Sequence, residues 1–73
     1  MYSKLIGARH EKGLSQSEMA KLLNMTTNTY YLKENRKAFI NKKGKKFLRD
    51  FSIEEANKIL IILNKKYEDI FLN

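Results

Sequence analysis

The chain lacks cysteine, proline and tryptophan, and it has only three glycines in 73 residues. Without cysteine, neither a disulfide nor a cysteine-based metal site can brace the fold. The absence of proline favours helices joined by short turns. Hydrophobic residues make up 42% of the chain, which is enough for a core held by ordinary packing. We therefore expect one small domain over residues 1–73.

Long hydrophobic runs are also absent. The longest uninterrupted apolar run, residues 59–63, is far shorter than the ~20 residues that span a bilayer. The first thirteen residues, MYSKLIGARHEKG, contain no apolar stretch typical of a signal peptide. These absences predict a cytoplasmic protein without a membrane partner.

Residues suited to catalysis are scarce. His10 is the only histidine, and its neighbour Glu11 is not at the helical spacing of a metal-binding pair. No cysteine nucleophile or phosphate-binding glycine run is present. The acidic pairs at residues 54–55 and 68–69 stand where helices are expected to begin, and the helix dipole explains them. We predict that the protein is not an enzyme and has no metal site, no cofactor and no small-molecule ligand.

One segment has no acidic residue at all. NRKAFINKKGKKFLR, residues 35–49, contains seven Lys or Arg side chains and no Asp or Glu. The chain has 15 basic and 8 acidic residues, so eight of each remain outside this segment. The whole net charge of +7 therefore lies in these residues. A basic segment on a neutral body suggests an anionic partner that binds along one edge.

Two Ser-x-x-Glu capping boxes predict helix starts, at residues 15–18 and 52–55. Apolar residues at helical spacing follow both boxes. For the second helix, the expected buried face consists of Ile53, Ala56, Ile59, Leu60 and Leu63. Two more helices are expected at residues 3–12 and, as a short final helix, at residues 67–72.

A further helix follows the first capping box closely. Asn24 is expected to end the preceding helix, since asparagine tolerates the left-handed conformation better than most residues. Thr26 or Thr27 is suited to cap the next helix, which reaches about Glu34. Two helices separated by three or four residues form a helix-turn-helix pattern. The expected fold is therefore all-α, with five helices.

The basic segment between the third and fourth helices allows two interpretations. It forms either a short hairpin around Gly44 or an irregular loop anchored by Phe39 and Phe47. In both cases it directly follows the third helix. It must therefore lie beside whatever that helix contacts.

Two stretches of the chain resemble the Cro/repressor-type helix-turn-helix family of phage and bacterial transcriptional regulators. They are KLIGARHEKGLSQSEMAKLLNMTTNTYYLKEN and FSIEEANKILIILNKKYEDIF. The resemblance implies a compact five-helix Cro/repressor-like domain with a long basic connection between helices 3 and 4. The chain departs from the family at Asn24 and Arg36, where Gly is usual, and at Lys33 and Lys65, where an apolar residue is usual.

The resemblance also implies roles for individual residues. The third helix becomes the recognition helix, with base contacts by Thr27, Asn28, Tyr31 and Leu32. The phosphate contacts expected of the helix-turn-helix are made by Gln16, Thr26 and Asn35. The charge of the basic segment, which follows the helix-turn-helix directly, predicts further phosphate contacts by Arg36, Lys37, Lys42, Lys43, Lys45 and Lys46. In the family, an Arg of the first helix pairs with a Glu of the third, here Arg9 and Glu34. Tyr30 is expected in the core, in a stripe with Met19, Ala20, Leu23 and Met25.

These features predict a sequence-specific, double-stranded DNA-binding transcriptional regulator, a repressor or Cro-like protein of a phage or mobile element in a bacterial host. The expected partner is a palindromic operator bound by a homodimer. An alternative is a protein-interaction adaptor of antirepressor or antitoxin type with the same fold. In the adaptor, Tyr31 and Leu32 would be apolar anchors, and the basic segment would bind an acidic protein.

Overall fold

Five helices and one hairpin make up the computed structural model, which describes residues 1–36, 38–40, 42–48 and 50–72. The elements are α1 (Ser3–Glu11), α2 (Gln16–Leu22), α3 (Thr27–Glu34), β1 (Ala38–Ile40), β2 (Lys46–Leu48), α4 (Ile53–Leu63) and α5 (Tyr67–Ile70). The five expected helices are confirmed within these ranges. Of the two interpretations of the basic segment, the structure has the hairpin.

Both predicted capping boxes are formed. The Ser15 hydroxyl accepts the Glu18 N–H at 3.1 Å, and the Glu18 carboxylate accepts the Ser15 N–H at 3.0 Å. Ser52 and Glu55 make the same reciprocal pair, at 3.1 and 2.9 Å. Each box satisfies two N–H groups that a helix start leaves without a partner inside the helix. These local bonds fix where α2 and α4 begin.

Left-handed residues follow the ends of three helices and change the chain direction. Asn24 follows α2 with φ 58°, Arg36 follows α3 with φ 52°, and Asn64 caps α4 with φ 54°. Asn24 and Arg36 are the two positions at which the resembled family usually has Gly. The backbone therefore keeps the turn that glycine favours, although a side chain in this region costs ~1–2 kcal/mol, less for Asn.

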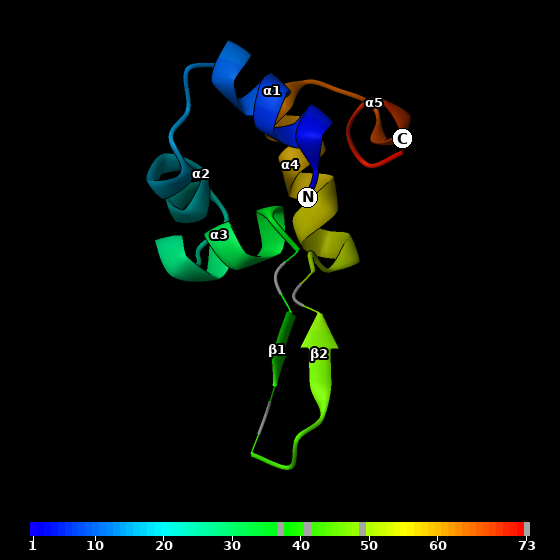
Figure 1. Ribbon diagram of the computed structural model, residues 1–73. Helices are drawn as coiled ribbons and strands as arrows, with labels where there is room; N and C mark the ends of the chain where they lie inside the picture. The colour runs from blue at the N-terminus through cyan, green and yellow to red at the C-terminus, as the bar shows by residue number, and fades with distance from the viewer. Residues whose placement is uncertain (37, 41, 49, 73) are drawn as a thin grey trace.

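The core draws on every helix. Its buried residues are Leu5, Met19, Ala20, Leu23, Tyr30, Ile59, Leu63 and Ile70. Of the core stripe expected around Tyr30, four residues are buried and Met25 is half-buried against them. Figure 1 shows the helices gathered around this common centre. No helix in the part of the chain that the structure describes is long and apolar enough to cross a membrane.

The expectation that Ile53 is buried is wrong. Ile53 is 82% exposed, because it is the first residue of α4, at the edge of the buried side of the helix. Ile61, which is 79% exposed, lies on the side of α4 that faces away from the core. The buried side of α4 consists of Ala56, Ile59 and Leu63, and the expected Leu60 is half-buried.

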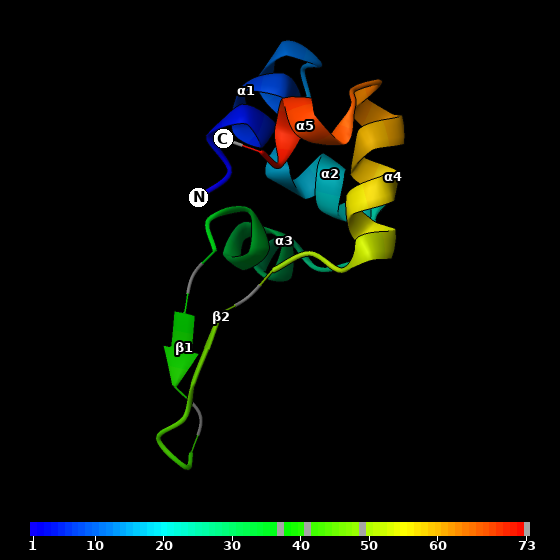
Figure 2. The same cartoon turned by 90° about the vertical axis from the view of Figure 1, so that its right-hand side faces the viewer.

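The two strands form an antiparallel hairpin in which Phe39 is paired with Phe47. It leaves the end of α3 and extends away from the helices in both views (Figures 1 and 2). The longest dimension of the molecule, 40 Å, greatly exceeds the other two, 25 and 19 Å. The radius of gyration is 12.6 Å, whereas a compact chain of this length has about 11 Å. The hairpin is therefore a projecting arm on a compact helical body.

Candidate nucleic-acid interface

A buried polar cluster fixes the inner side of α3. The Glu34 carboxylate accepts hydrogen bonds from Arg9 Nε at 2.9 Å and Arg9 Nη2 at 3.2 Å. It also accepts the Gln16 amide at 3.0 Å and the Tyr30 hydroxyl at 2.5 Å. The remaining guanidinium nitrogen, Arg9 Nη1, donates to the Leu14 carbonyl at 2.8 Å. The Arg9–Glu34 ion pair implied by the resemblance is thus present, and it joins α1, the start of α2 and α3.

Hydrogen bonds decide the charge state of this cluster. Burial alone would raise the pKa of Glu34, but the bonds from Arg9, Tyr30 and Gln16 outweigh it and hold this pKa below its usual value. Burial, followed by the bond to the Glu34 carboxylate, raises the pKa of Tyr30 above that of an ordinary phenol. Glu34 is therefore ionised and Tyr30 protonated at neutral pH, as their hydrogen bond requires.

The outer side of α3 gathers the four residues predicted to contact bases. Thr27 and Asn28 are exposed, Tyr31 is 40% exposed, and Leu32 is half-buried. Their spacing places Asn28, Tyr31 and Leu32 on the side of the helix away from the buried Tyr30, with Thr27 beside them in the first turn. This outer stripe of four residues offers an amide and hydroxyls for hydrogen bonds, together with apolar groups. Base edges in the major groove offer matching partners.

The uncharged residues predicted to bind phosphate already have partners inside the protein. The amide of Gln16 donates to Glu34, and that of Asn35 donates to the Tyr31 carbonyl at 2.9 Å. The Thr26 hydroxyl caps α3 by accepting a backbone N–H at 3.1 Å. Each primary amide has a second N–H to donate. Gln16 and Asn35 are therefore both held near the C-terminal end of α3 while keeping one donor each.

Basic residues occupy the tip of the hairpin. Lys42, Lys43 and Lys45 are exposed there, and Lys46 is the first residue of β2. Lys37 lies outside the described residues. Figure 2 shows this tip at the end of the molecule far from α1 and α5. Much of the excess positive charge is thus carried past α3 and away from the helical body.

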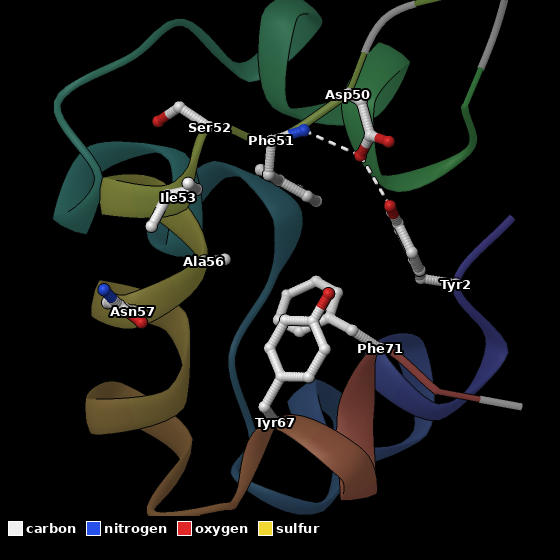
Figure 3. A pocket seen from close by; sticks show the side chains of 9 residues that line it. All are labelled: Tyr2, Asp50, Phe51, Ser52, Ile53, Ala56, Asn57, Tyr67 and Phe71. Atoms are coloured by element: carbon white, nitrogen blue, oxygen red, sulfur yellow. Dashed lines mark hydrogen bonds between the residues drawn. The ribbon is translucent and has the colours of Figure 1, made fainter.

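At the root of the hairpin, a cluster of Tyr2, Arg36 and Asp50 joins both of its ends to the N-terminus. The Tyr2 hydroxyl donates to the Asp50 carboxylate at 2.5 Å, as Figure 3 shows. The Arg36 guanidinium lies 3.8 Å from the same carboxylate and 5.4 Å from the centre of the Tyr2 ring. The Tyr2 N–H also donates to the Glu34 carbonyl at 3.0 Å. We call these three residues the hairpin-root cluster.

Sequence reasoning missed the hairpin-root cluster. Tyr2 and Asp50 are 48 residues apart, so no local spacing connects them. Burial, followed by the hydrogen bond to Asp50, raises the pKa of Tyr2 to about 12. The phenol therefore remains a proton donor to this carboxylate over the whole physiological pH range. The only sequence signal is an aromatic residue next to the first helix.

A pocket of about 160 Å³ lies beside this cluster (Figure 3). Aromatic rings form much of its wall, with the Phe71 ring 5.2 Å from both Tyr2 and Tyr67, centre to centre. Asp50 is the only carboxylate among the residues that line it, and Tyr2 and the Phe51 N–H already bond to it. Among the described residues, no group of three or more His, Cys, Asp or Glu could hold a metal ion. The pocket offers packing surface rather than an acid–base pair.

Lys33, which stands where the resembled family usually has an apolar residue, is engaged on the side of α3. Its ammonium group donates to both carboxylate oxygens of Glu55, at 2.8 and 3.0 Å. Both side chains are largely shielded from solvent. The bond links α3 to the start of α4 and directs this positive charge away from the outer stripe.

No protein-family model, curated protein or solved structure matches the chain.

Proposed function

We propose that the chain is a sequence-specific, double-stranded DNA-binding transcriptional regulator, a repressor or Cro-like protein of phage or mobile-element type. One observation carries the proposal: the outer stripe lies on α3, the helix whose C-terminal end leads into the basic hairpin. In this proposal α2 and α3 form a helix-turn-helix. In proteins with that motif, the second helix enters the major groove and the first crosses the phosphate backbone.

The hairpin supplies the electrostatic part of binding. Each Lys or Arg that neutralises a phosphate releases condensed counterions, which favours binding to any DNA sequence. Phosphate contacts position the protein, whereas base contacts specify the sequence. The basic hairpin and the uncharged stripe on α3 separate these two tasks between neighbouring elements. Such a division suits a protein that must find a site on long DNA and then recognise it.

The composition of the stripe predicts the base preference. It contains no Arg or Lys, although the commonest contact to guanine needs one of these side chains. Lys33, the nearest candidate, is held by Glu55. Asn28 can donate to and accept from adenine, and the methyl groups of Thr27 and Leu32 can contact the methyl group of thymine. The half-site should therefore be rich in A·T pairs where α3 reads it.

Exposed apolar side chains support a homodimer on a palindromic operator. Of the three consecutive apolar residues at 70–72, Leu72 is 52% exposed while Ile70 is buried. Ile53 and Ile61 add exposed apolar surface on α4. A two-fold dimer places its recognition helices one helical turn apart, ~34 Å, and a palindromic site matches that symmetry.

Selection from a pool of random duplexes tests the proposal. Bound duplexes are enriched over several rounds, and the dissociation constants of the enriched and random sequences are then compared. A consensus with inverted half-sites should emerge. Asn28→Ala should weaken binding to it by ~1–3 kcal/mol and relax one base position. Asn57→Ala, an equal change at an exposed position on α4, is the matched control and should have no effect.

The adaptor alternative predicts a different result. The exposed Tyr31 would then anchor a protein partner with Leu32 beside it, and no base sequence would be enriched. Binding to selected and random duplexes would be equally tight, and it would depend only on the salt concentration. That outcome would refute the proposed regulator.

A further inference from the structure

The hairpin is longer than a contact with the nearest phosphates requires. An extended chain rises ~3.3 Å per residue, so the stretch from Ala38 to Gly44, in which Ala38–Ile40 is strand, reaches at most about 20 Å. A helix in the middle of the major groove, which is ~12 Å wide, lies only about 6 Å from the groove edges. The middle of the neighbouring minor groove is half a helical turn away, ~17 Å. The reach of the hairpin matches this second distance.

The hairpin also points in the direction needed to reach the neighbouring minor groove. Tyr30 and Glu34 face the core, so the outer stripe of α3 faces away from the helical body. The hairpin also extends away from α1, α4 and α5, starting from the end of α3 (Figures 1 and 2). With α3 in a major groove, the hairpin therefore passes along the side of the duplex.

The hairpin-root cluster holds this direction. Arg36 precedes β1 and Asp50 follows β2, so their ion contact closes the two ends of the hairpin on each other. Tyr2 ties both ends to the body through its hydroxyl bond to Asp50 and its backbone bond to α3. Because binding then costs less conformational entropy, an arm held in place can add affinity that a loose arm would not.

The tip has a suitable chemistry for a narrow, negatively charged groove. Three exposed lysines surround Gly44, which has no side chain and a φ of 77°. The minor groove is only ~6 Å wide, and over A·T tracts it narrows further and attracts Lys and Arg. We infer that the hairpin places Lys42, Lys43 and Lys45 in the minor groove next to the major groove that α3 occupies. This inference rests on the proposed function and adds a second DNA site, with a preference for flanking A·T pairs.

Base analogues in the selected operator distinguish this site from simple phosphate contact. At a flanking position, an inosine·C pair keeps the minor-groove face of A·T but changes the major-groove face. A diaminopurine·T pair does the reverse, since it adds an amino group in the minor groove. Diaminopurine in the flank should weaken binding roughly five-fold or more, whereas inosine should be tolerated. At the bases that α3 reads, inosine should be the damaging change.

The triple variant Lys42→Gln, Lys43→Gln, Lys45→Gln should lose the discrimination between the two analogues in the flank. The matched control is Lys58→Gln, Lys65→Gln, Lys66→Gln, which removes the same charge at exposed positions in and after α4. The control should keep the discrimination. If the flank tolerates both analogues while α3 still reads its half-site, the hairpin meets phosphates only, and this inference falls while the proposed function stands. If no sequence is selected at all, both fall.

Discussion

The Glu34 carboxylate and the Arg9 guanidinium meet through two hydrogen bonds, at 2.9 and 3.2 Å, with both side chains buried. The bonds join the end of α3 to α1. Two bonds in parallel fix an orientation as well as a distance. The pair therefore sets which side of α3 faces outward, and so the stripe that is proposed to read DNA.

Removing the carboxylate should be costly. Glu34→Ala leaves the Arg9 charge buried without its partner, which is expected to lower the free energy of unfolding by ~3–5 kcal/mol. Glu54→Ala is the matched control at an exposed position in the first turn of α4. It should cost only ~0.3–1 kcal/mol, through the helix dipole. Denaturant unfolding of both variants measures the difference, and equal losses would contradict a structural role for the pair.

Stability should fall at acid pH because of the same carboxylate. The pKa of Glu34 in the folded chain is below the ordinary value of 4.5, so folding favours the ionised form. The resulting stabilisation is complete above pH 4.5 and disappears as the pH falls through the lowered pKa. Glu18 and Glu55, whose pKa values are also lowered, contribute in the same direction.

Unfolding measured as a function of pH tests this assignment. Glu34→Gln removes the titrating group and should flatten the loss of stability below pH 4.5. An unchanged acid dependence in Glu34→Gln would show that other groups govern it.

At position 24, in the turn between α2 and α3, glycine should preserve the stability of the fold and alanine should lower it. Asn24 has φ 58°, a conformation that favours glycine and that alanine adopts at a cost of ~1–2 kcal/mol. Asn24→Ala should therefore lower the thermal midpoint, while Asn24→Gly should preserve or raise it. The comparison isolates backbone conformation, since neither variant brings a functional group. An Asn24→Ala variant as stable as the parent chain would argue against this turn.

The Tyr2 hydroxyl should matter for DNA binding although Tyr2 itself is not proposed to contact DNA. Tyr2→Phe keeps the ring over which Arg36 lies but removes the bond to Asp50. The variant should fold, with a loss of ~0.5–1.5 kcal/mol in unfolding free energy. It should bind the operator several-fold more weakly, because the hairpin is less firmly held. Tyr67→Phe, at an exposed tyrosine, is the control, and equal affinities of the two variants would exclude a positioning role for Tyr2.

Local signals made the helix starts predictable. The capping bonds at Ser15 and Ser52 join residues three positions apart, so their spacing alone identifies them. The inward side of α3 was also predictable, because Tyr30 and Glu34 are one helical turn apart. The roles of Arg9 and Glu34 as partners came from the family resemblance, since their separation of 25 residues carries no local signal.

Tertiary packing decided what the sequence left open or misplaced. Ile53 has an apolar side chain like a core residue, but the buried side of α4 is the one that carries Ala56 and Ile59. The contact of Gln16 with Glu34 and that of Tyr2 with Asp50 depend on how distant elements come together. Whether the basic segment forms a hairpin or an irregular loop depends on the pairing of β1 with β2. The presence of Phe39 and Phe47 in the sequence was compatible with both.

The dependence of DNA affinity on salt concentration tests the central claim most directly: that α3 reads bases beside a hairpin that binds the charged backbone. The measurement compares the parent chain with a variant in which Lys42, Lys43, Lys45 and Lys46 are Gln. The slope of log affinity against log salt should flatten by ~0.9 for each phosphate that the variant no longer neutralises, while the preference for the correct bases under α3 is retained. A variant that keeps the full slope, or a parent chain without a base preference, would contradict the account.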